Sequence, residues 1–192
     1  AVQRALRAGT KIEDIFLCIH KVRQNSQVPI AILVYYNMLY TYGIQAFIEK
    51  CDAIGVDGLI IPDLPLEERE EVLPFIKEKN ISLIPLVAPT SKARIKKITN
   101  GADGFVYCVS SLGVTGERSE FHKEVESFLK EVRQSTHLPI AIGFGISKKE
   151  DILRFQRSVD GIIIGSAIVK QIHQCNADIL ETEKIVAHFS TK

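Results

Sequence analysis

The feature that most constrains the fold of this chain is a regular alternation of short apolar runs with amphipathic segments over its 192 residues. Uninterrupted apolar runs rich in Val, Ile and Leu are typical of strands buried on both faces of a sheet. Strands that alternate with helices predict a parallel α/β sheet with right-handed crossovers. We expect strands at 29–35, 58–62, 81–87, 104–109, 138–142 and 160–164.

The segments between these runs carry helical periodicity. In GIQAFIEKCDAI the apolar positions fall on one helical face: Ile44, Phe47, Ile48, Cys51 and Ile54. The opening stretch, AVQRALRAGT, has the character of the end of a helix. We expect this helix at 43–54 and further helices near 11–24, 66–79, 91–99, 119–135, 148–157, 166–174 and 178–189.

Three similar motifs, GVDGLIIPD, GADGFVYCV and SVDGIIIGS, place Asp-Gly directly before an expected strand. We therefore expect Asp57, Asp103 and Asp160 in turns at the amino ends of strands, where residues of a barrel serve stability. Evenly repeated βα units favour a closed barrel over a doubly wound sheet. A complete barrel has eight strands and typically ~250 residues. We expect 1–192 to be a single domain, a barrel that lacks its first two strands.

Composition agrees with a soluble globular protein, with 46% hydrophobic and 24% charged residues and a net charge of +1. This balance indicates no nucleic-acid surface. The sequence has no signal peptide and no apolar span of 18 residues, so we expect no membrane contact. Its four cysteines form no CxxC pair and no His/Cys cluster has metal spacing. We therefore expect reduced core thiols, no metal and a cytoplasmic protein.

Glycine and serine follow the last two expected strands, at the end where barrels carry their chemistry. IAIGFGIS places Gly143 and Gly145 there, and DGIIIGSAIV places Gly165 and Ser166. Backbone N–H groups at a helix N-terminus, with no bulky side chain in the way, suit a phosphate dianion. We predict a phosphate-ester site here, the alternative being ordinary turn glycines.

The longest expected loop, SSLGVTGER at 110–118, contains two glycines. Its length and composition predict a mobile lid over a bound ligand, the alternative being a passive surface loop.

Five motifs occur in an order and spacing that resemble the tryptophan synthase alpha subunit family over the whole chain: YYNMLYTYG, GVDGLIIPDLPLEE, SSLGVTG, GFGIS and IIIGSAIVK. The resemblance implies a (β/α)8 TIM barrel and a carbon–carbon lyase. The implied reaction cleaves indole-3-glycerol phosphate to indole and glyceraldehyde 3-phosphate in L-tryptophan biosynthesis. The resemblance also implies a beta-subunit partner in an alpha-2 beta-2 complex, with pyridoxal phosphate in that partner and no cofactor in this chain.

The resemblance assigns residues of this chain to four roles. The implied phosphate contacts are Gly116, Phe144, Gly145, Gly165 and Ser166. The implied indole pocket is lined by Leu33, Tyr35, Ile60, Leu86 and Ile163. The implied accessory catalytic residues are Tyr107 and the lid residue Thr115, and the implied partner surface comprises Asn37, Asp63 and Pro65.

The family's acid/base pair has no counterpart in this sequence. That pair is a glutamate at the end of the second strand and an aspartate in a PFSDPxADGP-type motif, and the chain begins just downstream with AVQRAL. Positioned acid/base groups each contribute about 10²–10⁴-fold to a rate. Two alternatives to the lyase therefore stay open: a phosphate-binding module that only partners a beta subunit, and a sugar-phosphate isomerase or epimerase.

Overall fold

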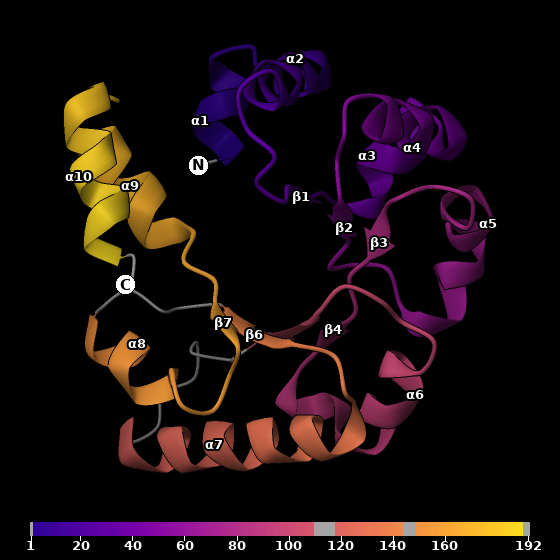
Figure 1. Cartoon of the computed structure of the whole chain (residues 1–192), viewed down its shortest axis with the longest axis vertical. Coiled ribbons are helices and arrows are strands. Elements are labelled where there is room, and N and C mark those ends of the chain that lie inside the picture. Colours follow the sequence, from indigo (N-terminus) through magenta and orange to yellow (C-terminus); the bar gives the residue numbers. More distant parts are fainter. Residues whose placement is uncertain (1, 110–117, 144–148, 190–192) are drawn as a thin grey trace. The chain divides into compact units, whose positions relative to one another are not determined.

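The computed structural model describes residues 2–109, 118–143 and 149–189, and helices and strands alternate along them (Figure 1). The elements in chain order are α1 (Val2–Arg7), α2 (Ile12–Arg23), β1 (Ala31–Leu33), α3 (Tyr36–Tyr42), α4 (Ile44–Ala53), β2 (Gly58–Ile60), the 3-10 helix η1 (Leu66–Glu71), α5 (Leu73–Ile76), β3 (Ser82–Leu83), β4 (Leu86–Val87), the 3-10 helix η2 (Pro89–Arg94), α6 (Ile95–Thr99), β5 (Val106–Val109), α7 (Arg118–Ser135), β6 (Ile140–Gly143), α8 (Lys149–Phe155), β7 (Gly161–Ile162), α9 (Ser166–Gln174) and α10 (Ile179–Phe189).

The strands form parallel sheets, as expected. One sheet has the order β1-β2-β3, and the other has the order β4-β5-β6-β7. The pairs β1–β2, β2–β3, β5–β6 and β6–β7 are all parallel. Each of the six expected runs contains strand residues, so the prediction of a parallel α/β architecture is confirmed.

Contacts within the chain divide it into two compact units. Unit 2 comprises 4–86 and 98–105, and unit 1 comprises 1–3, 87–97 and 106–192. The polypeptide therefore enters and leaves each unit more than once. The single-domain organisation stays a prediction.

The core of unit 2 is built on α4, whose apolar face was expected from its periodicity. Phe47, Ile48 and Cys51 are fully buried. Phe47 also packs on Phe16 and Tyr42, with ring centroids 5.4 and 5.7 Å apart. Such tilted and edge-on aromatic pairs add to the stabilisation that burial of the rings provides.

In unit 1, α7 supplies a buried stripe to the core around β5 and β6. The stripe comprises Val125, Phe128, Leu129 and Val132, at the i, i+3, i+4, i+7 spacing of one helical face. Every residue of β6 is buried, and so are the first three residues of β5. Helices α9 and α10 lie side by side in the same unit (Figure 1).

Proline interrupts two elements that were expected to be continuous. The expected strand 81–87 is split into β3 and β4, and Pro85 lies between them without an N–H to donate. The expected helix 66–79 is divided into η1 and α5. Pro74 lies in the first turn of α5, where it cannot donate to the carbonyl of an α-helix running in from 66–71.

The fold also corrects two expectations of detail. Helix α3 differs from the sequence prediction, in which a strand that ends at Tyr35 leads into a loop. Helix α3 ends at Gly43. The φ of this glycine is +95°, a backbone angle that residues with a side chain disfavour. The cysteines do not all lie in the core. Cys51 and Cys108 are buried, whereas Cys18 is exposed on α2 and Cys175 is half-buried.

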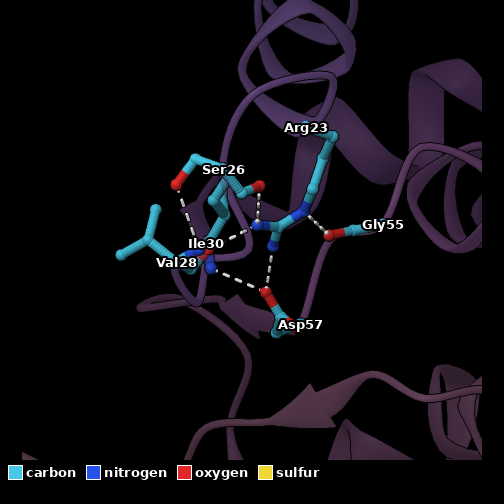
Figure 2. Close-up of polar contacts among 6 residues, drawn as sticks. All are labelled: Arg23, Ser26, Val28, Ile30, Gly55 and Asp57. Atoms are coloured by element: carbon cyan, nitrogen blue, oxygen red, sulfur yellow. Dashed lines mark hydrogen bonds and ion pairs between the residues drawn. The ribbon is translucent and has the colours of Figure 1, made fainter.

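An arginine–aspartate contact joins the amino ends of β1 and β2 (Figure 2). Arg23, at the end of α2, donates to Asp57 Oδ2 and to the carbonyl oxygens of Gly55 (2.7 Å) and Val28. The same Asp57 oxygen accepts the backbone N–H of Ile30 at 2.7 Å. Asp57 therefore lies in a turn before its strand, as expected, and ties a helix to two strands.

The same arrangement recurs in unit 1. Arg133, near the end of α7, pairs with Asp160, whose Oδ2 accepts the Ile140 N–H at 2.8 Å. Both isoleucines stand in the sequence Pro-Ile-Ala-Ile, at 29–32 and 139–142. Asp57 and Asp160 also donate their own N–H groups to the carbonyls of Ile30 and Ile140. Two of the three Asp-Gly motifs therefore form a structural contact at the amino ends of the strands.

Candidate functional site

The turn from β7 into α9 presents the first backbone N–H groups of that helix. Gly165 is the N-cap of α9 and Ser166 is its first residue, and both are exposed. The N–H groups of a first helical turn have no partner within the helix. The φ of Gly165, −112°, is accessible to any residue, and no described atom lies within 4 Å of the position that a Cβ would occupy. Neither the backbone nor packing against described residues requires glycine here.

Gly143 has a different physical basis. It ends β6, and a Cβ built on it would lie 2.6 Å from Cζ of Tyr107 on the neighbouring strand. Real Cβ atoms essentially never come this close to another atom. The glycine that the sequence suggested would leave room for phosphate is therefore required by the ring of Tyr107.

Tyr107 lies in the middle of the β5–β6 pairing, opposite Ala141. Its side chain is buried, and burial raises the pKa of the phenol above its usual value. The hydroxyl therefore stays protonated at neutral pH, where it can donate or accept a hydrogen bond. It cannot act as a charged base there.

The residues assigned to an indole pocket differ in exposure. Leu33 and Ile60 are register partners on β1 and β2, so their side chains emerge next to each other. Ile60 is buried, but Leu33 is 50% and Tyr35 is 57% exposed. In unit 1, the N–H of Ile163 donates to the Ile142 carbonyl at 2.8 Å, which places Ile163 beside β6.

Asp63, Asn37 and Pro65 lie on two adjoining segments of unit 2. Asn37 is on α3, and all three residues are exposed. Asp63 Oδ1 accepts the backbone N–H of Tyr36, the first residue of α3, at 2.8 Å. The carboxylate thus caps this helix, a role that satisfies one of its unpaired N–H groups.

Tyr36 and Glu71 were not singled out from the sequence. The hydroxyl of Tyr36 donates to Glu71 Oε2, and this bond is the main reason why the pKa of Tyr36 rises to about 12. The two residues are 35 positions apart, so no local pattern indicates their pairing.

Several predicted residues lie outside the described part of the chain: Thr115, Gly116, Phe144 and Gly145. The lid predicted at 110–118 falls there too, except for its last residue. Among the described side chains, no group of three or more His, Cys, Asp or Glu residues could hold a metal ion. Within the same residues, no helix has the length and apolar character needed to cross a membrane.

Comparison with known sequences gives a consistent family. The family model described as tryptophan synthase alpha chain matches residues 1–191. The chain is 46% identical over 185 residues to the tryptophan synthase alpha chain of Alkaliphilus metalliredigens, covering 96% of this chain and 70% of that protein. It is 52% identical over 170 residues to that of Thermoanaerobacter pseudethanolicus, covering 88% of this chain and 65% of that protein. The chain thus spans about two thirds of the length of these relatives.

Solved structures agree with the sequences. The tryptophan synthase subunit alpha from Campylobacter jejuni is 35% identical and has a TM-score of 0.86, with 96% of this chain and 74% of that chain covered. A chain of the tryptophan synthase a2b2 complex from Pyrococcus furiosus is 34% identical, also with a TM-score of 0.86, with 95% and 74% covered. The fold class is therefore α/β, of the (β/α)8 TIM-barrel type. On sequence and structure together, this chain belongs to the tryptophan synthase alpha chain family.

Proposed function

We propose that this chain is the substrate-binding and partner-binding part of a lyase that cleaves indole-3-glycerol phosphate to indole and glyceraldehyde 3-phosphate in L-tryptophan biosynthesis. The observation that carries the proposal is the 46% identity to a tryptophan synthase alpha chain over 96% of this chain. The partner is the beta subunit, in an alpha-2 beta-2 complex. Pyridoxal phosphate belongs to that subunit, this chain needs no cofactor, and the complex is cytoplasmic.

The substrate phosphate binds at the turn between β7 and α9. Support comes from Gly165, whose Cβ position is open among the described residues, and from the first N–H groups of α9, which have no partner within the helix. A dianion there is stabilised by the helix dipole. Ser166 contributes its hydroxyl, and Gly116, Phe144 and Gly145 complete the phosphate contacts.

The indole ring binds over aliphatic and aromatic side chains, because a flat apolar ligand favours a pocket with few polar groups. We assign this pocket to Leu33, Tyr35, Ile60, Leu86 and Ile163. Tyr107 contributes a protonated hydroxyl to the bound substrate, since burial raises its pKa. Thr115 contributes from the lid.

The cleavage needs a proton delivered to indole C3 and another removed from the glycerol hydroxyl. We assign these steps to the family's glutamate and aspartate, which lie outside the 192 residues of this chain. Asp63 is not a substitute, because its carboxylate caps α3. Each group of the pair accounts for about 10²–10⁴-fold in rate.

The activity is tested by indole release in the presence of a tryptophan synthase beta subunit. We expect the 192 residues alone to bind that subunit and release no indole above background. A version that carries the preceding segment of the Alkaliphilus metalliredigens relative should release indole, and the beta subunit should stimulate it. If this extended version binds the beta subunit but stays inactive, the lyase proposal is wrong and the binding-module alternative stands.

The phosphate site is tested by the pair Gly165→Asp and Gly165→Asn, which differ in charge but hardly in size. Affinity for indole-3-glycerol phosphate, measured by calorimetry, should fall at least about tenfold further for the Asp variant than for the Asn variant, because like charges repel at a desolvated site. If the two variants bound indole-3-glycerol phosphate with equal affinity, the proposal that the phosphate binds at this turn would be wrong.

A further inference from the structure

One residue, Tyr36, connects the two segments that carry the assigned partner surface. Its backbone N–H donates to Asp63 Oδ1 at 2.8 Å, and its hydroxyl donates to Glu71 Oε2. Asp63 precedes η1 and Glu71 is its last residue. Tyr36 therefore holds α3 against both ends of the segment 63–71.

Each of the two segments is also anchored in the core of unit 2. Leu39 of α3 is fully buried, and Leu64 is 9% exposed on the other segment. The guanidinium of Arg69 donates to the Ile98 carbonyl at 2.9 Å, and burial lowers the pKa of Arg69 below its usual value. Val72, directly after η1, is fully buried. The exposed residues of these segments therefore stand on a fixed base.

The exposed side of α3 has the composition of a protein-contact surface. Next to Asn37, Met38 is 45% and Tyr40 is 70% exposed, and methionine and tyrosine are enriched at such interfaces. A partner that meets an ordered surface loses less conformational freedom on binding than one that must order it. The hydrogen bonds of Tyr36 supply that order before the partner arrives.

We infer that Tyr36, through Asp63 and Glu71, is a positioning residue that presents Asn37, Asp63 and Pro65 to the beta subunit in one arrangement. The inference rests on the proposed function, since it takes the beta subunit as the partner. Tyr36 itself need not touch that subunit. Its effect is exerted through the relative placement of α3 and the segment 63–71.

The test is Tyr36→Phe, which keeps the ring and the backbone N–H and removes only the bond to Glu71. Tyr42→Phe is the matched control, because Tyr42 stands at the other end of α3 and donates to Glu13 Oε1 at 2.8 Å. The measurements, made on the intact protein, are the Kd for a tryptophan synthase beta subunit and the midpoint of thermal unfolding. We expect both variants to lower the midpoint by similar amounts, and only Tyr36→Phe to raise the Kd, by roughly five- to tenfold.

Variants of Glu71 separate positioning from stability. Glu71→Gln keeps an oxygen that can accept the hydrogen bond, so its Kd should remain within about twofold of wild type. Glu71→Ala should behave like Tyr36→Phe, and the double variant should bind no more weakly than either single one, because both remove the same bond.

The outcomes separate this inference from the proposed function. Wild-type affinity in Tyr36→Phe, or equal losses of affinity in Tyr36→Phe and Tyr42→Phe, would overturn the positioning role while leaving the beta subunit as partner. A wild-type protein that does not bind the beta subunit would overturn both.

Discussion

Gly143 and Gly165 show that similar glycines at the ends of neighbouring strands have different physical causes. At Gly143 a side chain would overlap the ring of Tyr107, whereas at Gly165 the space of a side chain is open among the described residues. Packing therefore accounts for the first glycine. The second is the glycine at which we propose that a ligand approaches the backbone closely.

Replacement of Gly143 by alanine should destabilise the protein by about 1–3 kcal/mol, because the new methyl group forces Tyr107 or the strand to move. Urea unfolding monitored by circular dichroism measures the change. Gly165→Ala is the control and should cost less than about 1 kcal/mol, since its methyl group meets no described atom. Tyr107→Phe should not rescue Gly143→Ala, because Cζ would still lie 2.6 Å from the added Cβ. Equal costs for the two alanine variants would contradict this assignment.

Asp160 should make stability depend on pH in the acid range. Its pKa is lowered, first by the hydrogen bond from Arg133 and then by the bond from the Ile140 N–H. A carboxyl whose pKa is lower in the folded than in the unfolded protein stabilises the fold above its unfolded pKa of about 3.9. That stabilisation is lost as pH falls through the folded pKa.

The measurement is the free energy of unfolding of wild type and Asp160→Asn between pH 7 and pH 2. The difference between them should be constant above about pH 5 and shrink below about pH 4. It should stay below about 1 kcal/mol, because this ion pair is half exposed. Asp103→Asn, in the second Asp-Gly turn, is the matched control, since no described arginine pairs with Asp103. A difference that grows below pH 4 would refute the assignment.

At the scale of elements, the Arg–Asp contact occurs at the amino ends of both β1–β2 and β6–β7. The two contacts differ in how deeply the arginine side chain is buried. The Arg23 side chain is 13% exposed, and it also donates to the carbonyl oxygens of Gly55, Val28 and Ser26. The Arg133 side chain is 43% exposed. Loss of a buried donor leaves its acceptors unpaired, whereas exposed ion pairs contribute little.

Arg23→Ala should therefore lower the free energy of unfolding by about 2–3 kcal/mol, and Arg133→Ala by less than about 1 kcal/mol. The two variants are matched, since each removes an arginine that pairs with the aspartate of an Asp-Gly turn. Denaturant unfolding of both proteins in the same buffer gives the comparison. If Arg133→Ala were the more damaging variant, burial would not govern the strength of this contact.

At the scale of the whole molecule, we predict one cooperative unfolding transition. The chain enters both compact units more than once, with crossings between 3 and 4, 86 and 87, 97 and 98, and 105 and 106. Neither unit is one continuous segment of the chain, so each is completed by residues that are distant in sequence. Differential scanning calorimetry should give a van't Hoff enthalpy equal to the calorimetric enthalpy. Two resolved transitions would show that the units unfold independently and would contradict the single-domain prediction.

Much of the architecture could be predicted from the sequence because it depends on local periodicity. The apolar face of α4 and the stripe on α7 follow from helical spacing, and the expected range 166–174 coincides with α9. The two prolines that divide 66–79 and 81–87 were visible in the sequence. Apolar spacing continues across both prolines and favours unbroken elements, so periodicity alone does not indicate the breaks.

The parallel α/β fold, the family and the turns that carry Asp57 and Asp160 could all be predicted from the sequence, because periodicity and short motifs contain that information. Other features depend on contacts that form only in the folded protein. Helix α3 is capped by Asp63, 27 residues away, and Gly143 is required by a ring on a neighbouring strand. Such contacts join residues that are distant along the chain, and they exist only after the strands have paired. Local propensity could therefore not reveal them.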